Sequence, residues 1–242
     1  MSARAAALIA ALLACSVALA SGAGIAPFSA AKPGGDLPAG WRALALPRVP
    51  APVFSLVEDS GVTVLRSRAA AAAGTVTHAL DALPARHPVL AWRWKVDRVL
   101  ARANLAEKSG DDFAARVYVF FDVPVETLSF GARVRSLLAR TVWGEELPTA
   151  AICYVWDNRH APGTSAWNPY TDRVRTVVLR SASPGDWAQE ARDLEADFRA
   201  AFGAQWPGPV PRVTGIAIGN DTDQTGEAAT AWFGDFALGA RR

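Results

Sequence analysis

The sequence predicts a mainly all-β protein: an antiparallel, jelly-roll-like β-sandwich of about nine strands with two surface helices. Apolar and polar residues alternate with a period of two over most of the chain beyond Pro52, the pattern of half-buried strands. These segments follow one another without regular intervening helices, which favours antiparallel sheets over a βαβ fold. Apolar residues make up 51% of the chain, enough for one large core. We therefore expect residues 51–242 to form a single domain.

Residues 1–20 have the pattern of a cleaved secretory signal peptide. A basic residue is followed by an unbroken apolar run over residues 5–14, and small residues precede a cleavage point after Ala20. The run is too short to cross a hydrocarbon layer of ~30 Å, and no later segment is suitable for a transmembrane helix. The sequence therefore predicts an exported chain, periplasmic or extracellular. In a less favoured alternative, LLAC is a lipoprotein box and the chain is anchored at Cys15.

Residues 21–50 are rich in proline, glycine and alanine, which predicts a flexible leader before the domain. The 25 basic and 23 acidic residues give a formal net charge of +2, and the two signs are interspersed. A chain without a basic cluster has no nucleic-acid footprint. Cys153 is the one cysteine beyond the signal peptide, so no internal disulfide is expected.

Turn residues separate the alternating segments and so define the expected strands. These strands cover residues 52–57, 61–67, 75–78, 88–97, 113–122, 150–157, 173–180, 213–220 and 228–238.

Two segments have helical rather than strand periodicity. Residues 127–140 carry a weak apolar stripe. The second helix is expected to begin after Ser183, because Ser-Pro-Gly-Asp at this point is a variant capping box. Its apolar stripe continues to Phe202, and Gly203 provides the stop. Both helices are interpreted as structural.

Trp92 and Trp94 share one face of the strand at 88–97, because side chains alternate along a strand. Tryptophans in this pattern often belong to a core. They can also form a ligand platform, since indole faces stack against sugar rings. The sequence leaves both interpretations open, and the two residues are candidate ligand-binding groups.

Asp112, Arg116 and Tyr118 fall on the mixed face of the strand at 113–122, opposite the apolar face that includes Phe113. An acid, a guanidinium and a phenol on one hollow face predict a polar binding site. The alternative is an ordinary ion pair between Asp112 and Arg116 on an exposed sheet surface.

Trp156 and Asn158 continue one face of the strand at 150–157 and lead into a loop, residues 158–170, that contains further aromatic residues. Long loops of this kind often carry binding residues, so Trp156 and Asn158 are also candidates. The three histidines lack metal-ligand spacing, and familiar hydrolase and nucleotide-binding signatures are absent. This favours binding over catalysis.

Asp221, Asp223 and Thr225, followed by Gly226, match the first half of a calcium-binding loop. The second half does not match, because Trp232 stands where a bidentate glutamate is needed. A partial site completed from elsewhere, by Asp111 or Asp235, would still bind Ca²⁺. The other interpretations are a catalytic acid pair and a turn that the side chains stabilise through backbone hydrogen bonds.

Five sequence blocks together resemble an exported bacterial family known as domain of unknown function 3047. They are LAWRWKVD, SGDDFAARVYVFFD, AICYVWDN, DWAQEARDLEADFRAAFG and VTGIAIGNDTDQTGEAATAWFGDFAL. The resemblance implies an exported protein and brings no established activity or catalytic residue. The final strand, ending FGDFAL, is also similar to the last strand of carbohydrate-binding jelly rolls.

The leading functional hypothesis is a non-catalytic module that binds a glycan or another polar ligand of the cell envelope. The alternative is a glycan-active hydrolase or lyase that uses Asp112, Asp221 or Asp223. A third hypothesis is a structural envelope protein with a protein partner. Calcium is the single cofactor that the sequence suggests.

Overall fold

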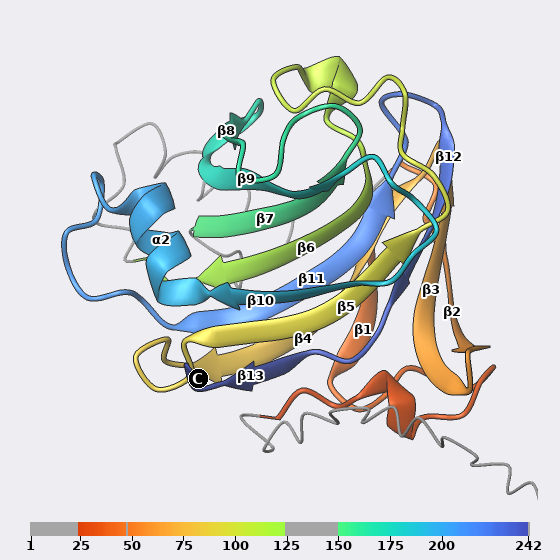
Figure 1. Cartoon of the computed structure of the whole chain (residues 1–242), viewed down its shortest axis with the longest axis horizontal. Helices are drawn as coiled ribbons and strands as arrows, with labels where there is room; N and C mark the ends of the chain where they lie inside the picture. The colour runs from red at the N-terminus through yellow and green to blue at the C-terminus, as the bar shows by residue number, and fades with distance from the viewer. Residues whose placement is uncertain (1–23, 47, 124–149, 242) are drawn as a thin grey trace, which may run out of the picture.

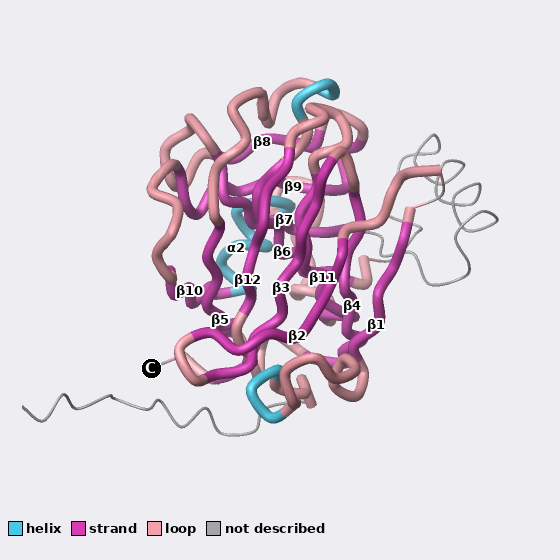
Figure 2. Tube along the Cα trace, turned by 90° about the vertical axis from the view of Figure 1, so that its right-hand side faces the viewer, coloured by secondary structure: helices cyan, strands magenta, loops and turns pink. Residues whose placement is uncertain are grey.

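A computed structural model describes residues 24–46, 48–123 and 150–241, which form two packed β-sheets (Figure 1). The predicted signal peptide, Cys15 and the predicted helix at 127–140 lie outside the described residues. Thirteen strands are present in the described part of the chain, more than the nine expected, together with one α-helix. Figure 2 shows two of the short helical segments at opposite ends of the strand-rich body. Among the described residues, no helix has the length and apolar content that a bilayer crossing requires.

The order of elements along the chain is dominated by strands. The elements are η1 (Phe28–Ala30), β1 (Trp41–Ala45), β2 (Val53–Asp59), β3 (Val62–Ala70), β4 (Ala73–Ala82), β5 (Val89–Val96), η2 (Lys108–Gly110), β6 (Phe113–Phe121), β7 (Ala150–Asp157), β8 (Ser165–Asn168), β9 (Thr171–Ser181), β10 (Ala188–Asp193), α2 (Leu194–Phe202), β11 (Val213–Asp221), β12 (Ala228–Phe233) and β13 (Ala237–Gly239).

The first sheet has seven strands in the order β1-β4-β11-β6-β7-β9-β8. The second has six strands: β10-β5-β12-β3-β2, with β13 also paired to β5. Neighbouring strands are antiparallel except β7 and β9, which run parallel. Strands distant in sequence are therefore neighbours, and β6 lies between β7 and β11.

The main core fills the space between the two sheets, because each strand there turns its apolar face inward. Strand β5 shows this clearly, since alternate residues along it are buried. The seven-stranded sheet contributes Val76, Val117, Ile152, Tyr154 and Ile216, and the six-stranded sheet contributes Leu65, Trp92, Trp94, Val96 and Phe233.

The predicted leader is anchored to the sandwich at two aromatic residues, whereas most of its described residues are exposed. Phe28 is fully buried, and its ring centre lies 4.8 Å from that of Trp41. Residues Trp41–Ala45 form β1, which pairs with β4 at the sheet edge. The burial of Phe28 and Trp41 could not be predicted from the local content of proline, glycine and alanine, because it depends on packing against residues distant in sequence.

The second predicted helix begins eleven residues later than its expected cap at Ser183. Residues Ala188–Asp193 form β10, paired with β5, and α2 covers only Leu194–Phe202. The N-cap is Asp193, whose side chain accepts hydrogen bonds from the backbone N–H groups of Glu195 and Ala196. Pairing with the sheet edge therefore overrides the helical pattern upstream of Asp193. Gly203 is the C-cap residue, as expected.

Candidate functional site

The start of β6 and the end of β11 meet at a local irregularity of the seven-stranded sheet. Gly219 pairs with Arg116, whereas Asp221 pairs with Phe113, so the register shifts between them. The shift turns Phe113 to the same side as Arg116, whose guanidinium carbon lies 4.7 Å from the Phe113 ring centre. Ala114 packs in the main core instead. The expectation that Phe113 faces away from Arg116 is therefore wrong, because a bulge interrupts the alternation.

Arg116 is the centre of a buried polar network and is only 4% exposed. Its Nε donates to Asp221 Oδ1 at 2.6 Å, and Nη1 donates to the Tyr118 hydroxyl at 2.8 Å. Its Nη2 donates to the backbone carbonyl of Asp111 and lies 3.5 Å from Asp111 Oδ1. The alternative of an exposed Asp112–Arg116 ion pair is therefore wrong: the guanidinium is buried, and its ion-pair partners among the described residues are Asp221 and Asp111.

Burial and neighbouring charges set the protonation of this network. Burial raises the pKa of Asp221 to about 7, an effect that Arg116 opposes and Asp112 and Asp111 reinforce. Burial lowers the pKa of Arg116, but the nearby negative charges, Asp221 first, outweigh it and raise the pKa above its ordinary value. Burial also raises the pKa of Tyr118 well above its usual range. The guanidinium is therefore charged and the phenol neutral.

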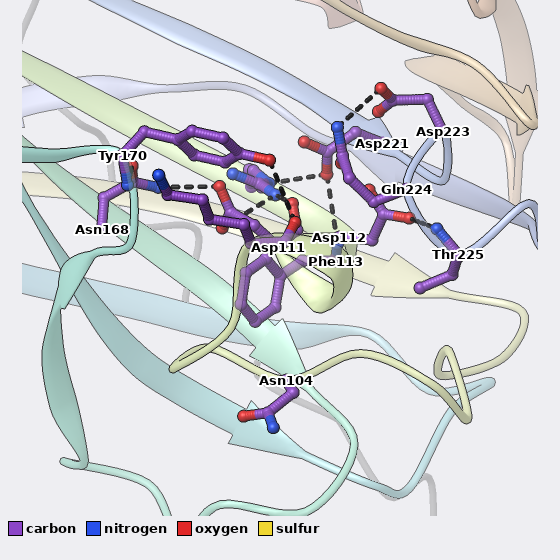
Figure 3. Close-up of polar contacts among 12 residues, drawn as sticks. Asn104, Asp111, Asp112, Phe113, Asn168, Tyr170, Asp221, Asp223, Gln224 and Thr225 are labelled. Atoms are coloured by element: carbon purple, nitrogen blue, oxygen red, sulfur yellow. Dashed lines mark hydrogen bonds and ion pairs between the residues drawn. The ribbon is translucent and has the colours of Figure 1, made fainter.

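Three carboxylates, those of Asp112, Asp221 and Asp223, lie close together (Figure 3) and are called the acidic group below. One oxygen from each residue lies within 4.8 Å of the others. Asp112 is fully buried at the entry to β6, and Asp223 is half-buried beyond the end of β11. Burial, followed by the charge of Asp112, raises the pKa of Asp223. The two strand ends therefore bring together acids that are more than a hundred residues apart in sequence.

A tight turn holds the segment after β11 against Asp112. The Gly226 N–H donates to the Thr222 carbonyl at 2.8 Å, and Gly226 has a positive φ of 65°, which glycine adopts without strain. The Thr225 N–H donates to Asp112 Oδ2 at 2.6 Å, and the Thr225 hydroxyl accepts from the Glu227 N–H at 3.4 Å. Thr225 thus positions Asp112 and the turn rather than joining the acidic group.

The two residues expected to complete a calcium loop have other partners. Asp235 accepts hydrogen bonds from the Ser29 backbone N–H at 2.9 Å and from the Ser29 hydroxyl at 2.5 Å. Asp111 accepts a hydrogen bond from Asn168 Nδ2 at 2.8 Å, in addition to its contacts with Arg116. The carboxylate that lies with those of Asp221 and Asp223 belongs instead to Asp112, the residue that follows Asp111.

Tyr170 borders the network on its exposed side (Figure 3). The residue is 56% exposed, and its hydroxyl donates to the Lys108 carbonyl at 3.0 Å. Residues 167–172 line an open hollow of about 380 Å³. Asn168, in this hollow, is fixed by its hydrogen bond to Asp111. An exposed aromatic ring therefore lies next to fixed polar groups.

Trp92 and Trp94 lie outside this site, in the core between the sheets. They are 4% and 0% exposed. Trp92 stacks on Phe236 with ring centres 5.9 Å apart, and Trp94 Nε1 donates to Glu190 Oε1 at 3.0 Å. Burial of both rings leaves no indole face for a sugar, so their position corrects the ligand-platform interpretation in favour of the core.

Trp156 and Asn158 also have structural roles. Trp156 is 3% exposed, and its Nε1 donates to the Ala182 carbonyl at 2.9 Å. Asn158 Nδ2 donates to three backbone carbonyls of the loop after β5, those of Leu100, Ala101 and Ala103. These contacts hold the loop and use the side-chain groups that a ligand would need.

A second aromatic group lies on the outer face of the six-stranded sheet. Trp187 has the Arg93 guanidinium 4.4 Å from its ring centre, and Lys95 Nζ lies 4.9 Å from the ring centre of Trp232. Lys95 is itself paired with Asp59. Cations of the same chain lie over these half-buried indoles, so they are not included in the candidate site. Lys108 Nζ likewise lies 5.3 Å from the Tyr170 ring centre, but Tyr170 is more exposed.

Sequence reasoning found Asp112, Arg116, Tyr118, Asp221 and Asp223, but treated them as two unrelated sites. Their convergence depends on the pairing of β6 with β11, which no local pattern reveals. Asn168 was not singled out, because an asparagine before a proline is typical of any turn.

The chain belongs to the family described as "Protein of unknown function (DUF3047)", which matches residues 39–237. No curated protein matches the sequence.

Several solved structures share a broad likeness with the chain. Endoglucanase 3 of family GH12 from Trichoderma harzianum is 5% identical, with a TM-score of 0.42 over 85% of this chain and 100% of that one. The xyloglucanase domain of NopAA from Sinorhizobium fredii, solved with cellobiose, is 8% identical, with a TM-score of 0.45 over 85% and 100%. Endoglucanase cel12A from Rhodothermus marinus is 9% identical, with a TM-score of 0.44 over 84% and 92%. Likenesses this distant say nothing about the activity of this chain.

Proposed function

We propose that this protein is an exported, non-catalytic module that binds a glycan or a similar hydroxyl-rich ligand of the cell envelope. The binding surface is formed by Tyr170 and Asn168 together with the network around Arg116. The observation that carries the proposal is the exposed Tyr170 ring, which lies directly beside charged groups held in place by hydrogen bonds.

Tyr170 has the chemistry that recognition of a sugar ring requires. An aromatic face packs against the apolar C–H face of a sugar and leaves the sugar hydroxyls available to polar partners. The hydrogen bond from the Tyr170 hydroxyl to the Lys108 carbonyl fixes the ring, so little side-chain entropy remains to be lost on binding. A ring fixed in this way, on a residue that is 56% exposed, supports a binding role.

The neighbouring polar groups supply hydrogen-bond acceptors in the same place. Asp111 holds Asn168 through Oδ2, and Arg116 holds Asp111 through its backbone carbonyl. Binding sites of this kind combine an apolar surface with a few fixed polar groups that set the orientation of the ligand. The arrangement supports a ligand with many hydroxyl groups.

The first test is to incubate the protein with a panel of bacterial envelope and plant polysaccharides. Depletion of the protein from solution and new sugar ends or unsaturated products are both recorded. We expect depletion without products. Tyr170→Ala should weaken the affinity about tenfold, which corresponds to ~1.4 kcal/mol. The control is Val53→Ala, an exposed apolar residue on β2 of the other sheet, which should bind as the wild type does.

Two results would count against the proposal. Unchanged affinity in Tyr170→Ala would place the ligand elsewhere. An absence of depletion by every polysaccharide would favour a protein partner instead.

The grouping of acids favours one second candidate, a glycan-active hydrolase or lyase. Retaining glycosidases use two carboxyl groups ~5–5.5 Å apart. Oxygens of Asp112, Asp221 and Asp223 lie within 4.8 Å of one another, which is close to that spacing. Products in the same panel that disappear in Asp112→Asn, with an unchanged melting temperature, would establish catalysis and overturn the binding proposal.

A further inference from the structure

The acidic group is compact enough to surround a single ion. Oxygens of Asp112, Asp221 and Asp223 lie within 4.8 Å of one another. Ca²⁺ binds oxygen at ~2.3–2.6 Å, so two ligands on opposite sides of the ion are roughly 5 Å apart. A Ca²⁺ ion placed between the three oxygens would lie within about 2.8 Å of each, close to its ordinary distance from oxygen.

An independent observation at Asp112 points to a missing partner. Asp112 is 0% exposed, and its Oδ2 accepts the Thr225 N–H. Its other oxygen, Oδ1, is shielded from solvent and has no hydrogen-bond partner in the part of the chain that the structure describes. A buried carboxylate oxygen without a partner carries a large desolvation cost. A cation next to Oδ1 would remove that cost.

Asp221 and Asp223 reach the same place from the other strand end. Asp221 uses Oδ1 for its hydrogen bonds with Arg116 and with the Phe113 N–H. Within the described residues, no protein donor contacts its Oδ2. Asp223 Oδ2 accepts from Gln224 Nε2 at 2.7 Å, a surface contact. Figure 3 shows Asp221 and Asp223 beside Asp112.

The local charge balance also favours a bound cation. Asp111 and the three members of the acidic group place four carboxyl groups around one guanidinium, that of Arg116. Arg116 pairs with Asp111 and Asp221. Among the described residues, neither Asp112 nor Asp223 forms an ion pair. Carboxylates this close repel one another unless a counter-charge lies between them.

We propose that Asp112, Asp221 and Asp223 form a binding site for a divalent cation, and that the cation is Ca²⁺. The group offers only oxygen ligands, which suit hard cations rather than Zn²⁺ or Cu²⁺. Ca²⁺ accepts irregular geometry and high coordination number, whereas Mg²⁺ demands a near-ideal octahedron. The acidic group takes its ligands from two separate segments, an irregular arrangement that suits Ca²⁺ better than Mg²⁺. Asp221 and Asp223 are half-buried, which leaves places for water on the ion.

The test uses the full chain with Ca²⁺ alone, so its result is independent of glycan binding. The protein is freed of metal with a chelator, and Ca²⁺ binding is measured by titration calorimetry together with the melting temperature. Ca²⁺ should bind and raise the melting temperature by several degrees, because a ligand that binds only the folded state stabilises it. NaCl at equal ionic strength is the control for charge screening.

Two variants locate the ion. Asp112→Asn keeps the acceptor for Thr225 but loses the charge, and Asp223→Asn changes the most accessible member of the acidic group. Each should weaken Ca²⁺ binding by at least about tenfold. Asp36→Asn, at an exposed aspartate with no ion pair among the described residues, should bind Ca²⁺ as the wild type does. If Asp112→Asn does not fold, Asp223→Asn decides the question.

Three results would overturn the proposal. The first is an absence of Ca²⁺ binding to the metal-free wild type. The second is NaCl raising the melting temperature as much as Ca²⁺ does. The third is unchanged Ca²⁺ affinity in Asp223→Asn, or an equal loss of affinity in Asp36→Asn.

Discussion

Arg116 Nε donates to Asp221 Oδ1 at 2.6 Å and so joins β6 to β11 where their register shifts. Both side chains are largely shielded, at 5% and 18% exposed. The Phe113 N–H also donates to Asp221 Oδ1, at 3.1 Å, so one carboxylate stabilises both the bulge and the guanidinium. The pair thus determines how the two segments of the candidate site are held together.

Arg116→Met should destabilise the fold strongly. The substitution preserves much of the side-chain volume but leaves Asp221 with only the Phe113 N–H as donor among the described residues, and it removes the guanidinium that donates to the Asp111 carbonyl. Breaking a buried ion pair by removing one partner costs ~3–5 kcal/mol, because an uncompensated charge remains. Urea denaturation of both proteins measures the loss in the free energy of unfolding.

Arg98→Met is the matched control for Arg116→Met. Arg98 is 65% exposed and pairs only with its neighbour Asp97 among the described residues. Exposed ion pairs of this kind contribute ~0–1 kcal/mol. Equal losses in the two variants would show that the Arg116 network does not stabilise the fold.

Trp94→Ala should act on stability, because Trp94 is a fully buried core residue. Truncation of a buried tryptophan to alanine costs ~3–5 kcal/mol. It also leaves Glu190 with Arg180 as its remaining side-chain partner among the described residues. In the same urea experiment the exposed Tyr170→Ala should lose less than about 1 kcal/mol. A Trp94→Ala protein of normal stability would argue against the core assignment.

The strands of the fold could be predicted from the sequence because their periodicity is local. The expected strand at 150–157 has the bounds of β7, and those at 113–122 and 213–220 differ from β6 and β11 by one residue at one end. Strands β1, β8 and β10 were missed, because each is fixed mainly by pairing with a distant strand rather than by its own alternation. The residues before Leu194 do have helical periodicity, but they form β10 because they pair with β5.

The residues of the candidate site could be predicted in part, but their arrangement could not. Asp221 and Asp223 were identified from a loop motif, and Asp112 and Arg116 from alternation along a strand. A bulge at the start of β6 and the neighbouring position of β11 create the contacts, and both depend on the folded sheet. Trp92 and Trp94 were wrongly chosen as ligand candidates. Alternation along a strand shows which side chains share a face, but it does not show which face is buried.

Cys153 should be unreactive in the folded protein. Burial raises the pKa of its thiol to about 12, so almost no thiolate is present at neutral pH. A Cys15→Ser chain leaves Cys153 as the single thiol, since the sequence contains two cysteines. A thiol reagent at pH 8 should not label this chain until urea unfolds it. Rapid labelling in native buffer would show that the thiol is accessible.

Asp193 should make the stability of the fold depend on acid pH. The hydrogen bond from Arg241 lowers the pKa of Asp193 most, burial opposes this, and the N–H of Ala196 and then of Glu195 lower it further. The unfolded chain has the ordinary aspartate pKa of ~3.9. A carboxyl whose pKa is lower in the folded state contributes stability above the unfolded pKa, and this contribution is lost as pH falls through the folded pKa.

Two substitutions separate the charge of Asp193 from its hydrogen bonds. Asp193→Asn keeps an acceptor for the helix N-terminus and loses the ion pair with Arg241. Its melting temperature should lie below that of the wild type at pH 7, and the difference should shrink steadily below about pH 4. Asp193→Ala also removes the cap, so it should lose a further ~0.5–2 kcal/mol that persists at low pH. A difference between wild type and Asp193→Asn that is the same at pH 7 and pH 3 would contradict the lowered pKa.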